Sequence, residues 1–471
     1  MSTGPYAFEG VRTQVRTLMR EESIPSISIA VAQDGAIIWE ESFGCADLTT
    51  SRPASPGTRY SLASVTKPIT STALMTLVER GEIDLDRPID DYLGQHKLRA
   101  PLDHANEATV RRVANHTAGL PKHYQFFYDD INITPPSQEE FIQRHGLLVT
   151  VPGEIFVYSN IGYALLEYAI ERVSGMSFAA FLTTEIFEPL RLRGISPVEC
   201  VQQADAAVRY HDGHQVPFYD FAHRGASSVF MSAHDLVRFG IFHLNGWVDG
   251  QQEEILRQDS LQTMLASPVS TGAPLPEKSH YGLGWTLGEK HGLRRFGHTG
   301  SMPGVAARLF MYPQENIAIA ILANAETPRL DEVEDRIVGS LLQSVTIDSG
   351  NPQWPGELTG LWTGFVTTND TRSPIELEIK GPGRVEVKVS KLTHSRALRA
   401  TFDARTAFLT VTGIMGDIGC ADAARHPYEL HFHLKLRDLN TLNGSVTAVS
   451  FAMQDRWGSA LSYWTELQRY N

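Results

Sequence analysis

The amino-acid sequence predicts a mixed α/β fold, an antiparallel sheet flanked by helices with a helical insertion, followed by an all-β barrel. Three observations lead to this fold class. A chain of 471 residues is too long for one compact core. Strand-like alternation lies on both sides of a long stretch of helical periodicity, and Pro- and Gly-rich punctuation near residue 350 precedes more alternating strands. We therefore expect an α/β region over residues 1–347, a linker over 348–356 and a barrel over 357–471.

The α/β region begins with a helix and a strand pair. Apolar residues recur with helical spacing over Glu9–Arg20, and Ser26–Phe43 is predicted to form two strands joined by the turn Gln33-Asp34-Gly35. Over about residues 65–290 the periodicity is mostly helical, with helices expected at Ile69–Glu79, Thr109–Asn115, Ile161–Ser174 and Asp235–Leu244. Strands return at Arg294–His298, Ala306–Met311 and Ala318–Leu322, before a last helix at Leu330–Leu342. The early hairpin and the late strands are expected to share one sheet.

The last part of the chain has the periodicity of strands. Apolar and polar residues alternate at Ile375–Ile379, at Val385–Val389 and again at Leu430–Leu436. Roughly eight such strands in about 115 residues are typical of a small antiparallel barrel or sandwich.

Composition and charge exclude several classes of function. The formal net charge is −13, and no run of basic residues is present that could neutralise nucleic-acid phosphates. Cys45, Cys200 and Cys420 are far apart and odd in number, which fits neither a disulfide framework nor a zinc site. His431 and His433 have no carboxylate or cysteine at a partner spacing. We therefore expect no nucleic-acid partner, no metal ion and no other cofactor.

The sequence also carries expectations about location. No apolar stretch is long enough to cross a bilayer, and the first nine residues lack the charged and apolar segments of a signal peptide. These features predict a soluble, cytoplasmic protein with no membrane partner, acting on small molecules of the cell interior. The oligomeric state is not predicted by any feature of the sequence.

The spacing Ser64-Val-Thr-Lys67 at a predicted helix start places a hydroxyl and an amine on one helix face. A serine hydroxyl becomes a good nucleophile when a neighbouring base takes its proton, and a partly desolvated lysine is neutral enough to do so. Exposed helix starts also produce this spacing readily. The pattern therefore indicates a nucleophile only in combination with other motifs.

A second motif, Tyr158-Ser-Asn160, opens the helix predicted from Ile161. A tyrosine at a helix entry can present its phenol to a nucleophile, and Asn160 can donate to a substrate carbonyl. The structural alternative is a half-buried tyrosine beside an asparagine N-cap.

A third motif, His298-Thr299-Gly300, ends a predicted strand. A glycine there would let a substrate backbone lie along the strand edge. The amide of Ser301, together with that of Ser64, could form an oxyanion hole. Taken by itself, the tripeptide is also compatible with a simple turn.

Each of the three motifs occurs once, and their order and combination resemble the penicillin-recognising serine enzymes. This β-lactamase/transpeptidase-like family includes class C β-lactamases, D-Ala-D-Ala carboxypeptidases, D-aminopeptidases, related esterases and lovastatin-type transesterases. The resemblance covers roughly residues 5–345 and extends to His116-Thr-Ala-Gly-Leu-Pro121, Ser232-Ala-His-Asp235 and Tyr281-Gly-Leu-Gly-Trp285. His298 in place of a lysine is more similar to the peptidases and esterases than to efficient class C β-lactamases. Leu358-Thr-Gly-Leu-Trp-Thr-Gly364 resembles the lipocalin-like C-terminal domain of some members.

The resemblance implies an acyl-enzyme on Ser64, with Lys67 and Tyr158 taking its proton as strongly coupled groups. Tyr158 would then protonate the leaving group, with His298 as a possible relay. If water attacks the acyl-enzyme, the protein is a hydrolase of small esters, amides or short D-amino-acid peptides. If an alcohol or amine attacks while water is excluded, it is an acyltransferase or thioesterase-like enzyme of a biosynthetic pathway.

A binding or assembly module without catalysis is the alternative from another class, and the intact motif residues argue against it. Two segments have two interpretations each. The aromatic stretch Lys122–Asp130 could wall the substrate pocket or belong to the core, and Tyr210–Arg224 could be a lid or a surface loop. The barrel could be a spacer, an oligomerisation surface or part of the pocket rim.

Overall fold

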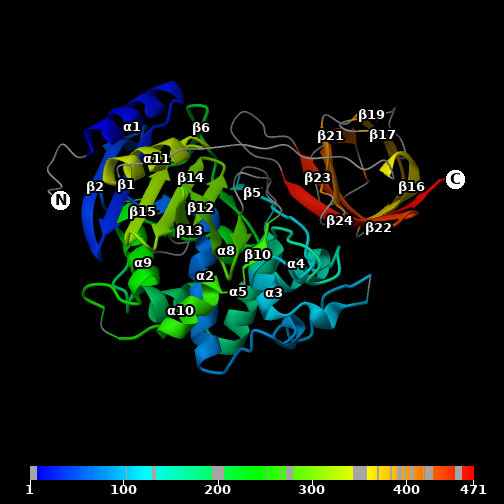
Figure 1. Cartoon of the computed structure of the whole chain (residues 1–471), viewed down its shortest axis with the longest axis horizontal. Coiled ribbons are helices and arrows are strands. Elements are labelled where there is room, and N and C mark those ends of the chain that lie inside the picture. Colours follow the sequence, from blue (N-terminus) through cyan, green and yellow to red (C-terminus); the bar gives the residue numbers. More distant parts are fainter. Residues whose placement is uncertain are drawn as a thin grey trace.

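The computed structural model of the chain contains two regions, which lie side by side in Figure 1. One is a large sheet covered by helices, and the other is a C-terminal barrel. The structure describes residues 8–101, 103–129, 134–193, 206–251, 253–266, 268–271, 279–342, 358–368, 371–381, 384–389, 395–396, 399–403, 408–416, 418, 428–450 and 459–470. The predicted linker, residues 348–356, lies outside these ranges.

An antiparallel sheet forms the framework of the first region, as the sequence predicts. The early hairpin and the late strands are neighbours in it, because β1 pairs with β15 on one side and β2 on the other. Its strands, in spatial order, are β10 (Val269–Ser270), β11 (His280–Tyr281), β12 (Thr286–Lys290), β13 (Leu293–Met302), β14 (Val305–Tyr312), β15 (Ile317–Ala323), β1 (Ser26–Gln33), β2 (Ala36–Asp47) and β3 (Arg52–Pro53).

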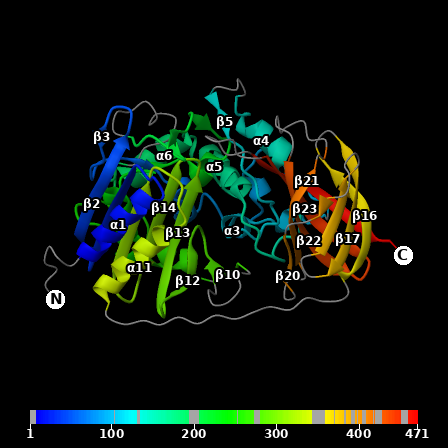
Figure 2. The same cartoon turned by 90° about the horizontal axis from the view of Figure 1, so that it is seen from above.

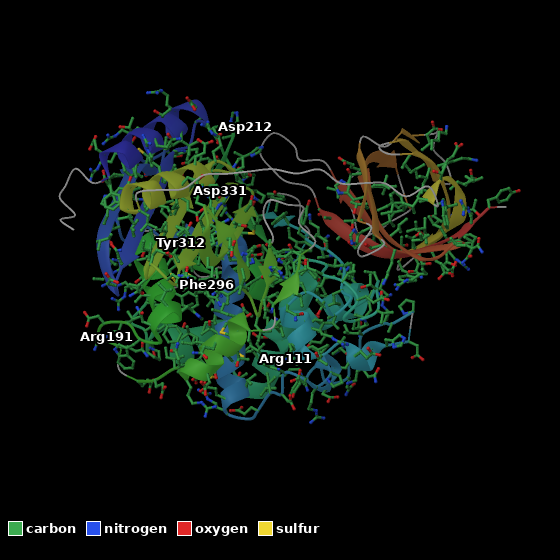
Figure 3. All side chains as sticks on the ribbon, viewed as in Figure 1. Arg111, Arg191, Asp212, Phe296, Tyr312 and Asp331 are labelled. Carbon is green, nitrogen blue, oxygen red and sulfur yellow. The ribbon has the colours of Figure 1, made fainter. Side chains whose placement is uncertain are left out.

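The two faces of this sheet are packed differently. On one face, large residues such as Ile27 and Ile319 pack against helices α1 (Glu9–Glu21) and α11 (Leu330–Leu341). Figure 3 labels two residues on this side of the sheet, Asp331 of α11 and Tyr312 of β14. On the other face the small residue Ala318 meets α9 (Ala233–Asn245), where a Cβ on Gly240 would lie 3.2 Å from the Ala318 Cβ. Small side chains therefore let α9 lie close to the sheet.

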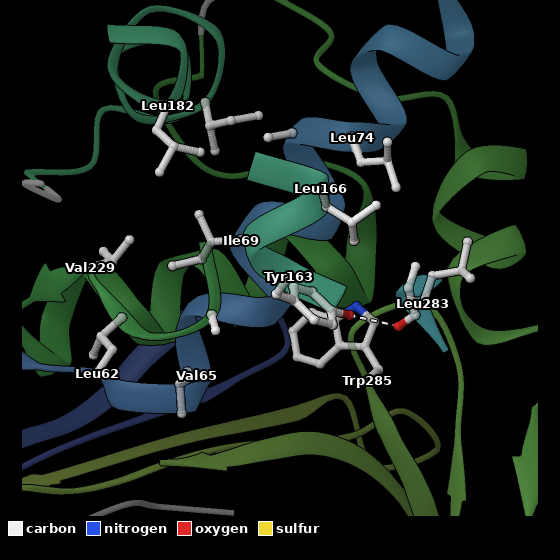
Figure 4. Close-up of a cluster of buried hydrophobic side chains, with 14 of the residues drawn as sticks. Leu62, Val65, Ile69, Leu74, Tyr163, Leu166, Leu182, Val229, Leu283 and Trp285 are labelled. Carbon is white, nitrogen blue, oxygen red and sulfur yellow. Dashed lines mark hydrogen bonds between the residues drawn. The ribbon is translucent and has the colours of Figure 1, made fainter. Parts of the chain in front are cut away.

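The helical insertion covers this second face. Its main elements are η1 (Ala63–Val65), α2 (Thr66–Glu79), η2 (Ile89–Asp91), η3 (Ala105–Glu107), α3 (Val110–Ala114), α4 (Gln138–His145), α5 (Asn160–Ser174), α6 (Phe178–Leu182), η5 (Thr183–Phe187), α8 (Arg224–Ser227) and α10 (Gln258–Leu265). Helix α2 is buried on all sides from Thr66 to Leu77 and forms the axis of the insertion. Figure 4 shows Ile69 and Leu74 of α2 within the same core as Leu166 of α5.

Short strand pairs also lie within the insertion. They are β4 (Tyr60–Ser61) with β9 (Phe230–Met231), β5 (Phe127–Tyr128) with β8 (Tyr219–Asp220), and β6 (Tyr210–His211) with β7 (His214–Gln215). The main sheet likewise extends to β10–β12, before the first late strand predicted from sequence. Strand β12 reads Thr-Leu-Gly-Glu-Lys and is partly exposed along its length, so it has none of the apolar alternation that identifies a half-buried strand.

The all-β prediction for the C-terminal residues is confirmed. Their described strands form one nearly closed antiparallel sheet (Figure 2) in the order β19 (Ser395–Arg396), β18 (Arg384–Val389), β17 (Arg372–Gly381), β16 (Gly360–Thr367), β24 (Ala460–Arg469), β23 (Thr441–Ser450), β22 (Tyr428–Asp438), β21 (Phe408–Gly416) and β20 (Arg399–Asp403). Alternate residues such as Ile375 and Leu377 point inward, where they pack around the buried Trp362.

Among the described residues, no helix combines the length and the apolar character that a bilayer crossing requires.

Candidate active site

Ser64 lies in the 3-10 turn η1, immediately before α2. The preceding residue, Ala63, is fully buried and has a φ of 47°, a left-handed conformation that costs free energy for any residue except glycine. Strained backbone of this kind persists where the surrounding packing enforces it. Here it turns the chain so that Ser64 is partly exposed, although both of its neighbours are buried.

Lys67 lies one helical turn after Ser64 and is completely buried. Its Nζ lies 3.1 Å from the Ser64 Oγ, 2.8 Å from the Asn160 Oδ1 and 3.1 Å from the carbonyl oxygen of Ala226. All three partners are neutral oxygens. Burial without a carboxylate disfavours the ammonium form and lowers the pKa of Lys67 well below its usual value.

Tyr158 lies against the same two groups. Its side chain is hydrogen-bonded to that of Ser64, and the Lys67 Nζ lies 4.7 Å from the centre of its ring. Burial raises the pKa of Tyr158 above its ordinary value, and the hydrogen bond to Ser64 offsets only part of that effect. The phenol is therefore protonated at neutral pH, while Lys67 is the group with the lowered pKa.

Asn160 begins helix α5, and the preceding Ser159 caps that helix by accepting a hydrogen bond from the Gly162 amide. The Asn160 Oδ1 faces Lys67, and its Nδ2 donates to the carbonyl oxygen of His123 at 2.7 Å. The side chain thus links the amine to a neighbouring backbone segment. One of its two N–H bonds is already committed to His123, so a substrate carbonyl could only receive the other.

His298, Thr299, Gly300 and Ser301 all lie on β13. Strand β12 pairs with β13 only as far as Gly297, so the described sheet leaves the next residues with a strand partner on one side only. The predicted strand edge is therefore present, and Thr299 and Ser301 are exposed along it.

The His298 ring is held at both nitrogens. Its Nδ1 lies 2.6 Å from the Thr299 carbonyl oxygen, which can only accept, so Nδ1 carries the proton. Its Nε2, 2.8 Å from the Tyr281 hydroxyl, then accepts from that group. Burial, with the positive charge of Lys67 as a second cause, lowers the pKa of His298 to about 3. His298 is therefore a neutral imidazole with both nitrogens engaged.

The sequence suggested that Gly300 makes room for a substrate backbone, but a close contact within the protein explains why this residue is glycine. A Cβ at this position would lie 2.2 Å from the carbonyl oxygen of Leu62 and 3.2 Å from the Cβ of Ala63. The glycine thus allows β13 to pack directly on the chain that leads into Ser64. Substrate backbone is not needed to explain it.

Sequence reasoning gave no role to Tyr281 and His116, although it noted the motifs that contain them. The His116 ring centre lies 4.5 Å from that of Tyr158 and 4.7 Å from that of Tyr281. Its Nδ1 accepts a hydrogen bond from the Ser159 amide, and its backbone φ is 64°. A histidine and a tyrosine therefore support the reacting groups from behind, through contacts that only the tertiary structure creates.

The two segments with open interpretations pack together beside Ser64. Strands β5 and β8 pair, and the rings of Phe126 and Tyr219 lie 5.0 Å apart. Both belong to a buried cluster that also contains Ala63 and Met302, the residues next to Ser64 and Ser301. The aromatic parts of the two segments are thus core beside the nucleophile, whereas residues 212–215 of the second segment are exposed.

Fold and site together define a serine hydrolase of the acyl-enzyme type. The sequence profile of the Beta-lactamase family matches residues 11–343, and the chain belongs to this family. A penicillin-binding protein of Bacillus subtilis (strain 168) is 28% identical over 329 residues, which are 64% of this chain and 68% of that protein. A D-aminopeptidase of Brucella anthropi is 25% identical over 393 residues, covering 81% of this chain and 71% of the relative.

Solved structures share the fold over nearly the whole chain. The octameric penicillin-binding protein homologue from Pyrococcus abyssi has a TM-score of 0.61 at 20% identity and covers 97% of this chain and 99% of its own. The crystal structure of SurE has a TM-score of 0.66 at 23% identity, covering 90% of this chain and 94% of its own. The family match confirms the resemblance to the β-lactamase-like and penicillin-binding enzymes that the motifs indicate, and these structures confirm the fold.

Proposed function

We propose that this protein is a serine hydrolase that forms an acyl-enzyme on Ser64 and cleaves ester or amide bonds of small substrates, including short D-amino-acid peptides. The observation that carries the proposal is the environment of Lys67. A completely buried amine, 3.1 Å from a partly exposed serine hydroxyl and without a carboxylate, is the arrangement a general base requires.

The first step transfers the Ser64 proton to Lys67. A neutral lysine amine has two N–H bonds and one lone pair. The two neutral acceptors, the Asn160 Oδ1 and the Ala226 carbonyl, take the two N–H bonds, which leaves the lone pair directed at the Ser64 hydroxyl. As the Ser64 Oγ bonds to the substrate carbonyl carbon, its proton moves to the Lys67 Nζ.

The substrate carbonyl oxygen then becomes an oxyanion. We place it between the backbone amides of Ser64 and Ser301, because Gly300 packs on Leu62 and so brings β13 against the start of the nucleophile turn. The exposed edge of β13 from Thr299 to Ser301 is the place where an extended substrate can lie.

The leaving group takes its proton from Tyr158. Its phenol is hydrogen-bonded to Ser64 and is protonated, so it lies beside the bond that breaks. The Lys67 ammonium, 4.7 Å from the ring centre, replaces that proton. His298 is no part of this relay, because Thr299 and Tyr281 occupy both of its nitrogens. Water attacks the acyl-enzyme by the reverse of these proton transfers, which releases the acid and restores Ser64.

The choice of D-amino-acid peptides rests on the relatives. A D-aminopeptidase covers more of this chain than the penicillin-binding protein of B. subtilis does. His298 in place of a lysine on β13 also favours peptides and esters over β-lactams, for which we expect slow turnover.

The test is the intact-protein mass after incubation with a penicillin, a fluorophosphonate or a p-nitrophenyl ester, for wild type and Ser64→Ala. D- and L-alanine p-nitroanilides are assayed in parallel. We expect an adduct and turnover in the wild type alone, with the D-substrate preferred. If no probe forms an adduct with the wild type, the acyl-enzyme mechanism is wrong. If product appears only when an alcohol or amine is added, the protein is an acyltransferase and not a hydrolase.

A further inference from the structure

The barrel touches the first region through its strand β24. The backbone of Ala460, the first residue of this strand, forms two hydrogen bonds with Tyr124, one of 3.0 Å from the Tyr124 amide and one of 2.6 Å to the Tyr124 carbonyl. Two residues further along, the Ser462 hydroxyl donates to the carbonyl oxygen of Lys122. Tyr124 therefore forms a single β-bridge with the start of β24, and His123 lies between the two residues that the barrel holds, Lys122 and Tyr124.

A second contact joins the barrel to the turn that precedes Tyr158. The Glu154 carboxylate accepts from the Arg437 guanidinium and lies 3.0 Å from the Lys435 Nζ, both on β22. The three side chains are only 24%, 17% and 20% exposed, so water screens these charges less than on an open surface. Burial raises the pKa of Glu154, but the two cations outweigh it and hold the pKa below its usual value.

Both anchored segments lead directly to the reacting groups. The carbonyl oxygen of His123, between the two residues that β24 holds, accepts the hydrogen bond from the Asn160 Nδ2, and Asn160 holds Lys67. Glu154 is four residues before Tyr158 on a short segment. Figure 1 shows the label of β24 on the side of the barrel nearer the first region.

We propose that the C-terminal barrel is a positioning element of the active site, which holds Tyr158 and Asn160 against Lys67 through Glu154 on one segment and through the β24 contact with residues 122–124 on the other. Glu154 and Ser462 are positioning residues, because neither touches Ser64 or Lys67. The inference rests on the proposed function, since it assigns the barrel a part in that reaction. If the barrel were only a spacer, removing either contact would leave turnover unchanged.

Two single variants of the full-length chain test it. Glu154→Gln keeps the shape of the side chain and removes its charge, and Ser462→Ala removes the hydroxyl that reaches Lys122. The matched control is Glu185→Gln, because Glu185 is 23% exposed and pairs with Arg80, away from Ser64 and from the barrel contacts. For each protein we would measure kcat and KM with a p-nitrophenyl ester, the rate of Ser64 labelling by a fluorophosphonate, and backbone hydrogen exchange resolved to residues 122–124 and 154–162.

We expect kcat and the labelling rate of Glu154→Gln to fall about fivefold, with KM changed less than about twofold, because small displacements of reacting groups lower the rate without removing substrate contacts. The amides of Val157 and Ser159, which bond to the carbonyl and the Nδ1 of His116, should exchange faster. Ser462→Ala should have a smaller effect in the same direction, and the double variant should show the sum of the two free-energy changes. Glu185→Gln should match the wild type in every measurement.

Unchanged kcat, labelling and exchange in both barrel-contact variants would overturn the inference. A loss of kcat equal in Glu154→Gln and Glu185→Gln would overturn it too, because the effect would then be general. The proposed function fails separately, through a wild type that is neither labelled nor active. In that case the exchange measurement still decides whether the barrel holds the segment that carries Tyr158 and Asn160.

Discussion

Two basic side chains in this protein, the partly buried Arg295 and the completely buried Lys67, lie on opposite sides of one sheet and have opposite surroundings. Arg295 and His298 are three residues apart on β13, so their side chains point to opposite faces. Arg295 faces α11, where the fully buried Glu334 accepts from it at 2.7 and 2.8 Å. On the His298 side lies Lys67, whose partners are three neutral oxygens.

The difference shows what makes a buried cation structural or reactive. Burial lowers the pKa of Arg295, but Glu334 more than compensates, and the pKa of Arg295 is raised. Lys67 has burial alone, so its pKa falls. A carboxylate fixes the charge and joins α11 to the sheet, whereas its absence leaves an amine that can take and return a proton.

The largest effect is expected for Lys67→Arg. A guanidinium keeps the positive charge but does not deprotonate in a protein, so it cannot accept the Ser64 proton. We expect kcat/KM for an ester to fall at least about a thousandfold. The measurement is steady-state turnover together with fluorophosphonate labelling. Retention of more than a tenth of the activity would mean that Tyr158, and not Lys67, is the base.

Glu334→Gln should act on stability instead. It leaves the partly buried Arg295 without its counter-charge and leaves Lys290 with Asp335 as its remaining carboxylate partner. Removing one partner of such a pair costs about 3 kcal/mol of unfolding free energy. The protein that remains folded should keep its kcat, which we would compare with the thermal unfolding midpoint. Asp91→Asn is the control, because Asp91 and its partner Arg87 are 37% and 62% exposed and such a pair should contribute at most about 1 kcal/mol.

Asn160→Asp would give Lys67 the partner that Arg295 has. A carboxylate in place of the amide oxygen 2.8 Å from the Lys67 Nζ favours the ammonium form and raises the pKa of Lys67. The neutral amine is the active form, so activity is lost as pH falls through that pKa, and the variant should lose it at a higher pH than the wild type.

At neutral pH we expect about a thirtyfold loss of turnover in Asn160→Asp, recovered in part on going to alkaline pH. The pH dependence of ester hydrolysis measures both effects. Asn160→Ser, which adds no charge, should lose activity without moving the acid limb. An equal shift of the limb in both variants would contradict the electrostatic explanation.

The smallest effect concerns Tyr281. In Tyr281→Phe the His298 Nε2 loses its donor, and the ring loses the hydrogen bond that helps to fix its orientation. We expect kcat to fall about fivefold, since a neutral hydrogen bond contributes about 1 kcal/mol. Tyr168→Phe, which removes from α5 a hydroxyl that donates to Glu139 of α4, should leave kcat unchanged. The pH dependence of kcat should show no inflection near pH 6.5 in the wild type, because burial lowers the pKa of His298 to about 3.

The sequence predicted the fold class and the groups that meet at the site, because local patterns encode them. Ser64 and Lys67 share a helix turn, Tyr158 and Asn160 share a helix entry, and His298 precedes Gly300 on a strand. What these patterns could not predict is which partner each group has. The short β12 was missed because it has no apolar alternation.

Long-range contacts explain the remaining differences. The hydrogen bond between Tyr281 and His298, which in our proposal excludes His298 from proton transfer, joins β11 to β13, two strands that β12 separates in the sheet. The reason for Gly300 is a carbonyl more than two hundred residues earlier in the chain, that of Leu62. The ion pairs of Glu154 with the barrel likewise depend on how two separately patterned regions meet.

The contact between Gly300 and Leu62 has a consequence for how such an enzyme diversifies. Main-chain atoms set the distance between the nucleophile turn and β13, so side-chain changes at Phe126 or Tyr219 reshape the neighbourhood of Ser64 without altering that distance. The backbone contact between Gly300 and Leu62 is therefore the fixed part of the site, and the side chains beside Ser64 are the variable part. The distance between the turn and β13 thus depends on two stretches of backbone, whereas the surroundings of Ser64 depend on side chains that substitution can change one at a time.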